Sequence, residues 1–394
     1  MTMKPHKIWF ISSYVPRMCG IATFTDNLMD AIKAADQRSE FLVCAMDDDG
    51  GYDYPDAVKC VIRQEESGDY SKAAELINAS DADVVCIQHE FGIFGGFNGR
   101  KLLDLLQSLN KPVVLTLHTV PIHQTEPFVI VPKRFRSRKK LLQQIFRQVR
   151  IITVMTETAR EYLIHHYQVS PDQVVVIPHG APVLTEVGKS GYRRAKEAIG
   201  FEKNDFVISS FGLISPKKGL EYVIRALPAI IKQNPEVSVK YLIAGRMHPK
   251  KSDEYLTGLK QLAKDRGVAD RVVFDNRYLT FEEIYRYLAN TDIYITPYYA
   301  KEQVSSGTLS YALAAGCCVV STPYIFASEL VKRFGIGELI EFRDEQSIKR
   351  VVGRLVAQPE LVKQYRQNAE KFGSNIHWPQ IGQRFLDVFD QLAR

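Results

Sequence analysis

The sequence has no apolar run long enough to cross a membrane. A spanning helix needs about 20 consecutive apolar residues, and the 394 residues contain no such stretch. Low-complexity tracts and short internal repeats are also missing, which argues against a disordered linker protein or a solenoid. The N-terminal residues run directly into a predicted strand, so we expect no signal peptide.

Cysteine is scarce, and its placement does not suggest a disulfide framework. Of the six cysteines, Cys44, Cys86, Cys317 and Cys318 lie inside apolar runs, where a thiol acts as a small core residue. No Cys/His spacing suits zinc. These features predict a reduced, cytoplasmic protein. The formal net charge of +6 is mild for this length and excludes no class of partner.

Length and composition favour two globular domains, with 45% hydrophobic and 24% charged residues. In the first half, continuous apolar runs alternate with helical patterns such as 23–34, 70–79 and 99–109. The expected strands are 8–12, 41–45, 58–62, 84–88, 113–117, 151–155 and 174–178. This alternation predicts a parallel sheet covered by helices on both faces.

A second alternating series follows the polar stretch 185–204, which is the expected linker. Its predicted strands are 206–211, 239–244, 272–274, 292–296 and 318–321, with helices at 220–232, 253–265 and 281–289. We expect an α/β protein with two doubly wound, Rossmann-like domains, 1–184 and 205–377, facing each other across a cleft. The amphipathic terminal helix, 378–394, needs a partner surface on the second domain or, by packing back, on the first.

Ligands of parallel sheets bind beyond the C-terminal ends of the strands. In the first domain this rule selects the loop that contains Arg17 and Gly20, the pair His89 and Glu90, and His118. The segment after His89 is rich in glycine and aromatic residues, and it is typical either of sugar binding or of a plain turn.

The most informative stretch is 296–322. An apolar strand stops at Pro297, and the hydroxyls and glycine of the segment 305–308 then precede an apolar helix that ends near Gly316. Such a turn can bind an anion, because unpaired N–H groups and the helix dipole both face it. The alternative is an ordinary serine-capped helix start.

Six motifs in order resemble the retaining family-4 glycosyltransferases of GT-B fold, and the resemblance covers nearly the whole chain. The motifs are the glycine loop 16–20, His118, the segment 177–180, the loop 212–219, the helix region 303–316 with its following strand, and Trp378. The resemblance implies a donor-side second domain and an acceptor-side first domain.

The resemblance also implies roles for individual residues. The catalytic set is His118, Lys218 and Gln303. Residues that would bind the donor or its phosphate are Gly20, Gly212, Lys217, Arg246, Ser305, Ser306, Gly307, Thr308 and Tyr311. Residues that would bind the acceptor, a saccharide or a lipid-linked sugar, are His89, Glu90 and Arg17. A nucleotide sugar is then a substrate, and we expect neither a cofactor nor a metal.

Three departures from the family pattern bear on the donor. Gln303 and Tyr311 stand where relatives carry glutamates, and Leu213 stands where they carry an arginine. These changes favour a phosphorylase that uses a sugar 1-phosphate as the competing enzyme class, whereas Lys218 and His118 argue against a non-catalytic carbohydrate-binding relative. The acidic run Asp47–Asp49 resembles a metal motif of another glycosyltransferase fold, but its position after the second strand favours a solvated turn.

The one basic run extends from Lys133 to Arg150 and mixes aromatic and aliphatic residues with the charges. This composition suits an anionic membrane surface on the inner face or a lipid-linked acceptor. A merely solvated basic helix is the alternative. Nucleic acid is a weaker candidate, because the chain shows no fold known to bind it. The sequence does not indicate an oligomeric state.

Overall fold

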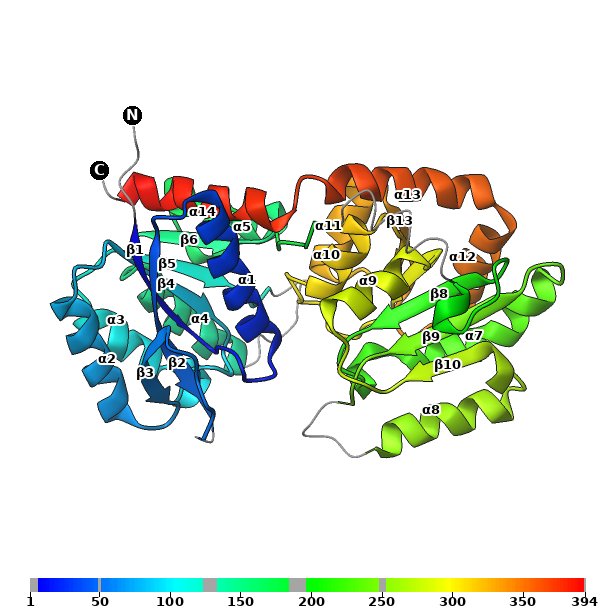
Figure 1. Cartoon of the computed structure of the whole chain (residues 1–394), viewed down its shortest axis with the longest axis horizontal. Coiled ribbons are helices and arrows are strands. Elements are labelled where there is room, and N and C mark those ends of the chain that lie inside the picture. Colours follow the sequence, from blue (N-terminus) through cyan, green and yellow to red (C-terminus); the bar gives the residue numbers. More distant parts are fainter. Residues whose placement is uncertain (1–5, 49–50, 123–132, 184–195, 248–252, 393–394) are drawn as a thin grey trace. The chain divides into compact units, whose positions relative to one another are not determined.

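The structure is a computed structural model that describes residues 6–48, 51–122, 133–183, 196–247 and 253–392 (Figure 1). The chain divides into two compact units. Unit 1 comprises Met1–Gly180 and Trp378–Arg394, and unit 2 comprises Ala181–His377. Each unit has its own parallel sheet with helices packed against it, so the predicted α/β class with two Rossmann-like domains is confirmed.

Unit 1 is built on a seven-stranded sheet in the order β3-β2-β1-β4-β5-β6-β7. Its strands are β1 (Lys7–Ser12), β2 (Glu40–Asp47), β3 (Val58–Arg63), β4 (Val84–His89), β5 (Val113–Leu117), β6 (Ile151–Val154) and β7 (Val174–Val176). All neighbouring strands run parallel. The central strands β4 and β5 are buried along their whole length, as expected where helices cover both faces.

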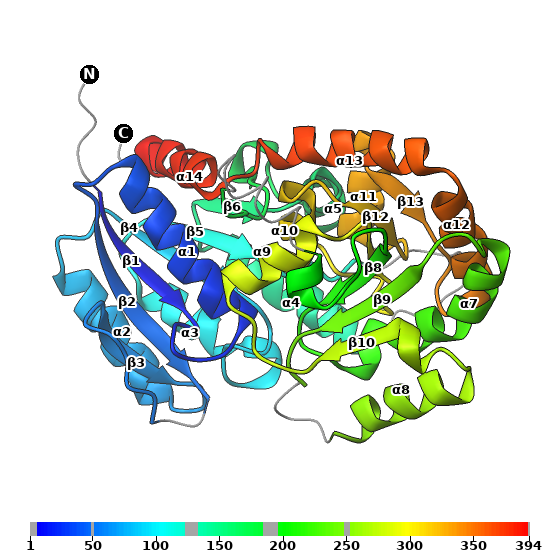
Figure 2. The same cartoon turned by 45° about the vertical axis from the view of Figure 1, so that its right-hand side comes forward.

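Six α-helices are described in unit 1. They are α1 (Gly20–Ala35), α2 (Ser67–Ala79), α3 (Lys101–Ser108), α4 (Lys133–Phe146), α5 (Glu157–Tyr167) and the terminal α14 (Trp378–Leu392). Short 3-10 turns η1 (Phe97–Gly99) and η2 (Pro171–Gln173) complete the unit. Helices α1 and α14 lie side by side (Figure 1, Figure 2).

Unit 2 is built on a six-stranded sheet in the order β10-β9-β8-β11-β12-β13. Its strands are β8 (Phe206–Phe211), β9 (Val239–Ala244), β10 (Val272–Asp275), β11 (Ile293–Thr296), β12 (Cys318–Ser321) and β13 (Gly337–Leu339). Sequence reasoning missed β13, because three residues that begin with a glycine make no apolar run. Val319 pairs with Gly337 there, and a side chain at Gly337 would meet the Val319 carbonyl oxygen.

Seven α-helices are described around this second sheet. They are α7 (Leu220–Gln233), α8 (Glu254–Asp265), α9 (Phe281–Ala289), α10 (Gly307–Ala314), α11 (Ile325–Phe334), α12 (Glu345–Ala357) and α13 (Pro359–Gly373), with 3-10 turns η3 (Glu197–Ile199), η4 (Pro216–Lys218) and η5 (Ala269–Arg271). Apolar side chains of α7, α8 and α12 join those of β8, β9 and β11 in one core.

The boundary between the units differs from the predicted one. It falls at Gly180/Ala181, four residues before the expected linker 185–204, because the Ala181 N–H donates to the Ile376 carbonyl oxygen at 2.8 Å. Residues 184–195 lie outside the described part of the chain. The last part of the expected linker belongs to unit 2, since Lys196 Nζ donates to the Asp205 carbonyl at 2.6 Å and to Asp292 at 3.3 Å.

Both sheets have a point where the strand order reverses, between β1 and β4 in unit 1 and between β8 and β11 in unit 2. Loops that leave two adjacent parallel strands in opposite directions open a crevice at the C-terminal edge, where ligands of such sheets bind. The loops that border these two crevices follow Ser12, His89, Phe211 and Thr296.

We predict that Gly382→Ala destabilises unit 1 by about 1–3 kcal/mol, the usual cost of overpacking a core. A Cβ at Gly382 in α14 would lie 2.3 Å from the Ala31 carbonyl oxygen of α1. Gly258→Ala in α8 is the matched control, because a Cβ there meets nothing within 4 Å. The control should gain helix propensity, up to ~1 kcal/mol. Urea unfolding of both variants measures the difference, and equal effects would show that α14 does not pack closely on α1.

Candidate functional site

Lys218 lies at the reversal point of the second sheet, on the loop that follows β8. Its Nζ donates to the Phe211 carbonyl oxygen at 3.1 Å and to the Tyr298 hydroxyl at 2.6 Å, and it sits 4.3 Å from the centre of the Tyr298 ring. Tyr298 belongs to the loop after β11. The ammonium is thus fixed by side-chain and backbone groups from both strands that flank the reversal point.

Two glycines allow the loops to approach this closely. Gly212 has φ +108°, and a Cβ there would lie 2.9 Å from Lys218 Nζ. Gly219 has φ +65°, and a Cβ there would lie 2.2 Å from the Pro297 carbonyl oxygen. A side chain at either position would be strained by the backbone conformation and would push the loops apart. The predicted loop 212–219 therefore needs both glycines for its shape.

Four buried aromatic rings lie beneath the ammonium, and sequence reasoning missed them. Tyr298 stacks on Tyr324 with ring centres 5.5 Å apart, and Phe211 stacks on Tyr294 at 6.0 Å. Burial by itself raises the pKa of Tyr298, but the Lys218 charge and the hydrogen bond from Lys218 oppose it, and the pKa is lowered. The available signal was an aromatic residue shortly after each of β11 and β12.

The N-terminus of α10 lies next to the same ammonium. Ser306 caps the helix by accepting a hydrogen bond from the Leu309 N–H at 3.3 Å, and Gly307 begins it. The Thr308 methyl carbon lies 3.5 Å from the Cβ position of Gly212, which is itself 2.9 Å from Lys218 Nζ. A lysine ammonium and a helix N-terminus therefore meet at one place, and both favour a bound anion.

Gln303 and Ser305 belong to the loop that leads into α10. The Gln303 amide donates to the Ser305 carbonyl oxygen at 2.7 Å, and its side chain is half-buried. Gln303 therefore stabilises the loop in this structure, and its contact with a donor sugar stays a prediction.

Three further residues were predicted to bind the donor. Tyr311 is packed between α10 and α9, with its ring 5.7 Å from Phe281 and 6.2 Å from Tyr285, and burial raises its pKa. Lys217 in η4 and Arg246, shortly after β9, are exposed. The ribose contact of Tyr311 and the phosphate contacts of Lys217 and Arg246 stay predictions.

At the reversal point of the first sheet, Arg17 is engaged within unit 1. Its guanidinium donates to Asp48 Oδ2 at 3.0 Å and to the Met46 carbonyl oxygen at 3.1 Å. Both groups are largely buried, with 14% and 16% of their side chains exposed. Asp48 belongs to the acidic run that was predicted to be a solvated turn. It instead forms an ion pair with Arg17, the residue predicted to bind the acceptor. Gly20 begins α1, and a Cβ there would meet nothing within 4 Å.

The edge of the first sheet carries buried histidines. His118, after β5, hydrogen-bonds Gln88 at 2.9 Å through Nε2 and contacts the Phe24 ring with centres 4.8 Å apart. Its backbone N–H donates to the His89 carbonyl oxygen at 3.1 Å. Burial lowers the pKa of His118 to about 3, with smaller contributions from nearby His179 and His89. The ring is therefore neutral at pH 7.

His89, at the end of β4, is fully buried, and neither ring nitrogen has a hydrogen-bond partner among the described residues. Its ring lies between Phe91, at 5.0 Å, and Phe94, at 6.0 Å. Burial lowers the pKa of His89 to about 4, with a smaller contribution from the Arg138 charge. Glu90 beside it accepts hydrogen bonds from its neighbour's N–H and from the Thr119 hydroxyl.

Two family models match the chain in succession. Residues 19–183 match a model described as Glycosyltransferase Family 4, and residues 192–372 match one described as Glycosyl transferases group 1. Together they span most of both units. The chain belongs to the group 1, family 4-like glycosyltransferases.

Known glycosyltransferases agree with this assignment. The alpha-monoglucosyldiacylglycerol synthase of Streptococcus pneumoniae is 24% identical over 323 residues, which is 78% of this chain and 68% of that one. A sucrose-phosphate synthase from Thermosynechococcus elongatus superposes with a TM-score of 0.75, 16% identity and coverage of 98% and 99%. Anabaena HepE in complex with UDP-glucose gives a TM-score of 0.72, 18% identity and coverage of 98% and 100%. The two solved structures confirm the predicted GT-B fold.

Most described apolar residues of the basic run face the core of unit 1. Leu141, Leu142, Ile145 and Phe146 of α4 are buried there. Arg138 lies over the Phe91 ring at 4.3 Å. The aliphatic residues that favoured membrane insertion thus serve the core, whereas the exposed charges of the described part of the run can still face an anionic surface. Within the described chain no helix is long and apolar enough to span a bilayer.

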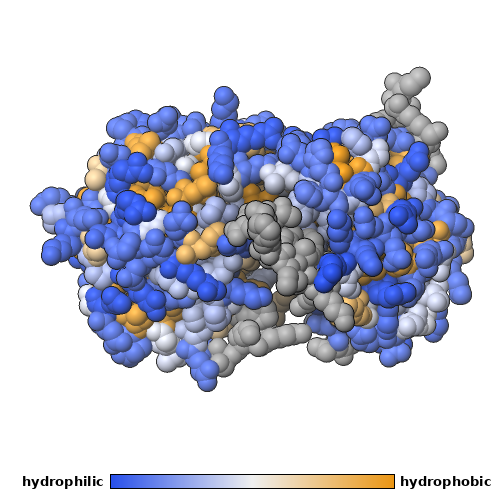
Figure 3. Space-filling view, turned by 180° about the vertical axis from the view of Figure 1, so that it is seen from behind, coloured by the Kyte–Doolittle hydropathy of each residue, from blue (hydrophilic) through white to orange (hydrophobic). Residues whose placement is uncertain are grey.

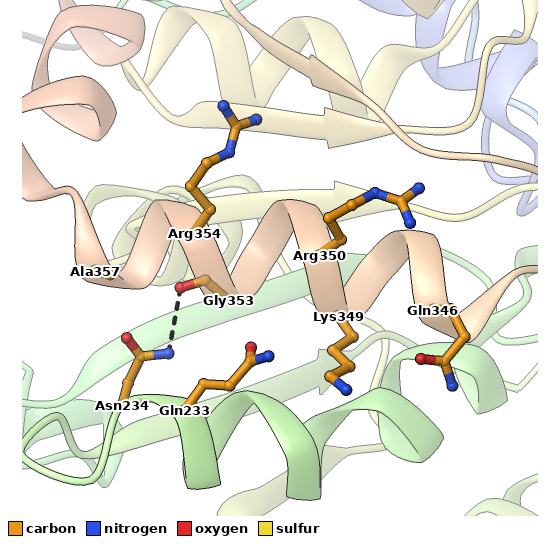
Figure 4. Close-up of a pocket in the computed structure, with 8 residues that line it drawn as sticks. All are labelled: Gln233, Asn234, Gln346, Lys349, Arg350, Gly353, Arg354 and Ala357. Atoms are coloured by element: carbon orange, nitrogen blue, oxygen red, sulfur yellow. Dashed lines mark hydrogen bonds between the residues drawn. The ribbon is translucent and has the colours of Figure 1, made fainter.

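A surface groove between α7 and α12 carries three basic residues, but they do not converge (Figure 4). Lys349 points toward α7, whereas Arg350 and Arg354 point to the other side of α12. Arg354 is also paired with Glu338. On the face seen in Figure 3, hydrophobic residues form small separate groups in a mostly hydrophilic surface. The basic side chains of this groove therefore do not form an anion site like the one at Lys218.

We predict that acid weakens the fold partly through His89. Its folded pKa of about 4 lies below the ordinary value of 6.5, so between these pH values the unfolded chain binds a proton that the folded chain does not. The free energy of unfolding therefore falls as pH falls. His89→Leu should lose less stability from pH 7 to pH 5, and at pH 7 it should be at least as stable, because no unpartnered ring nitrogen remains.

The control for this prediction is His165→Gln on α5, whose ring is exposed. It should keep the pH dependence of the wild type in urea unfolding. A His89→Leu chain with the same loss as the wild type between pH 7 and pH 5 would show that His89 does not contribute as described.

Proposed function

We propose that the protein is a retaining glycosyltransferase that moves a sugar from a nucleoside diphosphate donor to a saccharide or lipid-linked acceptor. The observation that carries this is the Lys218 ammonium, held by Phe211 and Tyr298 beside the N-terminus of α10. Unit 2 is the donor side and unit 1 the acceptor side. Titles of two matching structures name UDP and UDP-glucose as ligands of Anabaena HepE, which supports a diphosphate donor.

The bond changes follow from the leaving group. The bond between the sugar C1 and the diphosphate oxygen breaks, and its electron pair leaves with the phosphate. The acceptor hydroxyl oxygen forms the new bond to C1 on the same face, and its proton goes to the departing phosphate oxygen. The protein must therefore stabilise growing negative charge on the phosphate, which preorganised donors do best.

Lys218 is the main source of this stabilisation. A helix N-terminus contributes about 0.3–1 kcal/mol to a bound anion when exposed, and up to ~2 kcal/mol when partly buried. Losing one preorganised donor to a developing oxyanion commonly costs about 3–4 kcal/mol. The ammonium therefore has to supply more than the end of α10, and its fixed position means that little reorganisation is needed during transfer.

The uncharged groups suit the sugar and the acceptor. The neutral imidazole of His118 can donate to or accept from a hydroxyl, and Gln303 can do the same. Arg17 already pairs with Asp48, so its proposed part is to shape the acceptor loop. We propose that no metal takes part, because the lysine and the helix end already provide positive charge for the phosphate.

A phosphorylase that uses a sugar 1-phosphate is the second candidate. It is favoured by Leu213, which stands in place of an arginine on the phosphate loop, and by Tyr311, whose ring is packed against Phe281 and Tyr285. Both changes remove expected contacts to a nucleotide, whereas the proposed site for one phosphate at Lys218 remains.

The enzyme is proposed to act in the cytoplasm. A lipid-linked acceptor would bring it to the inner face of a membrane, where the exposed Arg136, Lys140, Arg147 and Arg150 can meet anionic head groups. The name of the Streptococcus pneumoniae relative, a glucosyldiacylglycerol synthase, supports such an acceptor.

The decisive test of this function is an assay in EDTA with UDP-, GDP- and ADP-sugars and with sugar 1-phosphates. We expect transfer from one nucleotide sugar, with the donor's anomeric configuration kept in the product, as measured by proton NMR. Transfer only from a sugar 1-phosphate would select the phosphorylase. An inverted product, or activity that returns only with manganese or magnesium, would contradict retention or metal independence.

We predict that Lys218→Ala lowers kcat/KM by about a hundredfold or more, because it removes a charged donor from the leaving phosphate. Lys264→Ala is the control, since this lysine is exposed on α8. Thermal unfolding checks that both variants are folded. A folded Lys218→Ala enzyme with near-normal kcat/KM would show that the phosphate binds elsewhere.

A further inference from the structure

Two cysteines lie directly opposite each other in the sheet of unit 1. Cys44 of β2 and Cys60 of β3 are register partners in the parallel ladder, where a bulge after Val43 shifts the pairing. Adjacent strands are about 4.8 Å apart. Disulfides join residues whose Cα atoms are about 4.4–6.8 Å apart, so the backbone spacing is already compatible with a bridge.

The side chains of this pair converge. As register partners of a parallel ladder, the two residues carry their side chains on the same face of the sheet, so the thiols lie beside each other. Their exposure differs: Cys44 is fully buried, whereas Cys60 is partly exposed on β3, the edge strand of the sheet. The neighbouring Cys44 thiol lowers the pKa of Cys60, against the opposing effect of burial, whereas the neighbouring Cys60 and burial raise the pKa of Cys44.

Because of this asymmetry, the two thiols differ in reactivity. A reactive cysteine is one with thiolate character and access to solvent, and a buried thiol is inert until its neighbour is modified. Cys86 and Cys318 are also buried, but neither of them stands opposite another cysteine in the described ladders. The pair Cys44/Cys60 is therefore distinct from the other core thiols.

We propose that Cys44 and Cys60 form a reversible, redox-sensitive dithiol site, in which Cys60 reacts first with a small disulfide such as glutathione disulfide and Cys44 then closes an intramolecular bridge. This site is separate from the proposed sugar-transfer chemistry, so it stands or falls independently of it.

The exchange balances without another reagent. The Cys60 thiolate attacks one sulfur of glutathione disulfide, which forms a mixed disulfide and releases one glutathione thiolate that takes up the proton from Cys60. The Cys44 thiol then loses its proton and attacks the Cys60 sulfur, which releases the second glutathione. The two protein thiols are oxidised to one disulfide, and glutathione disulfide is reduced to two thiols.

Closure would restrain a loop that supports the edge of the first sheet. The segment between the cysteines contains Asp48, the partner of Arg17. A cross-link stabilises a fold mainly by restricting the unfolded chain. Oxidation should therefore raise the midpoint of thermal unfolding of unit 1, and a reductant such as dithiothreitol should reverse the rise.

The test uses the full-length protein, reduced, desalted and then incubated with glutathione disulfide. Remaining thiols are alkylated, and the peptides are mapped by mass spectrometry. We expect the peptides of Cys44 and Cys60 to be joined in the wild type, and Cys86, Cys317 and Cys318 to stay unmodified until the chain is unfolded.

Two variants separate the steps. In Cys44→Ala, Cys60 should stop at the glutathione adduct, and in Cys60→Ala, Cys44 should stay a free thiol. Neither variant should show the oxidation-dependent rise in thermal midpoint. The proposal is overturned if wild-type Cys60 stays unmodified in the folded protein, if it stops at the glutathione adduct, or if Cys44 reacts equally well without Cys60.

Discussion

The proposed donor site depends on the hydrogen bonds that the Lys218 ammonium donates to groups at the ends of two adjacent strands. The carbonyl of Phe211 comes from the end of β8, and the Tyr298 hydroxyl comes from the loop after β11. These strands are neighbours only because the strand order of the sheet reverses between them. Gly212 and Gly219 then let the two loops approach closely enough for the lysine to reach both acceptors.

The two units offer different chemistry at the corresponding edges of their sheets. In unit 2 the edge combines a lysine with the N-terminus of α10, which suits a phosphate. In unit 1 burial keeps the rings of His89 and His118 neutral, and Arg17 is paired with Asp48. That edge presents neutral hydrogen-bonding groups, which suit sugar hydroxyls. This difference in charge supports the proposed division into donor and acceptor sides.

The sequence predicts most strands and helices, because buried parallel strands appear as continuous apolar runs. It also singles out Lys218, through the resemblance of the loop 212–219 to the phosphate loop of family-4 glycosyltransferases. It does not reveal Tyr298 as the partner of that lysine, because the two side chains come from loops about eighty residues apart and only the strand order unites them. The same reason explains why the aliphatic residues near Ile145 looked available for a membrane, although they fill the core.

Tyr298 holds the Lys218 ammonium that we propose stabilises the donor phosphate, and a double-mutant cycle measures how strongly the two side chains act together. Calorimetric titration would compare the wild type, Lys218→Met, Tyr298→Phe and the double variant, each with UDP, GDP and ADP. We expect tight wild-type binding of one nucleotide and strong non-additivity, with an interaction energy of about 1 kcal/mol or more. Additive losses, or equal binding by all four proteins, would contradict it.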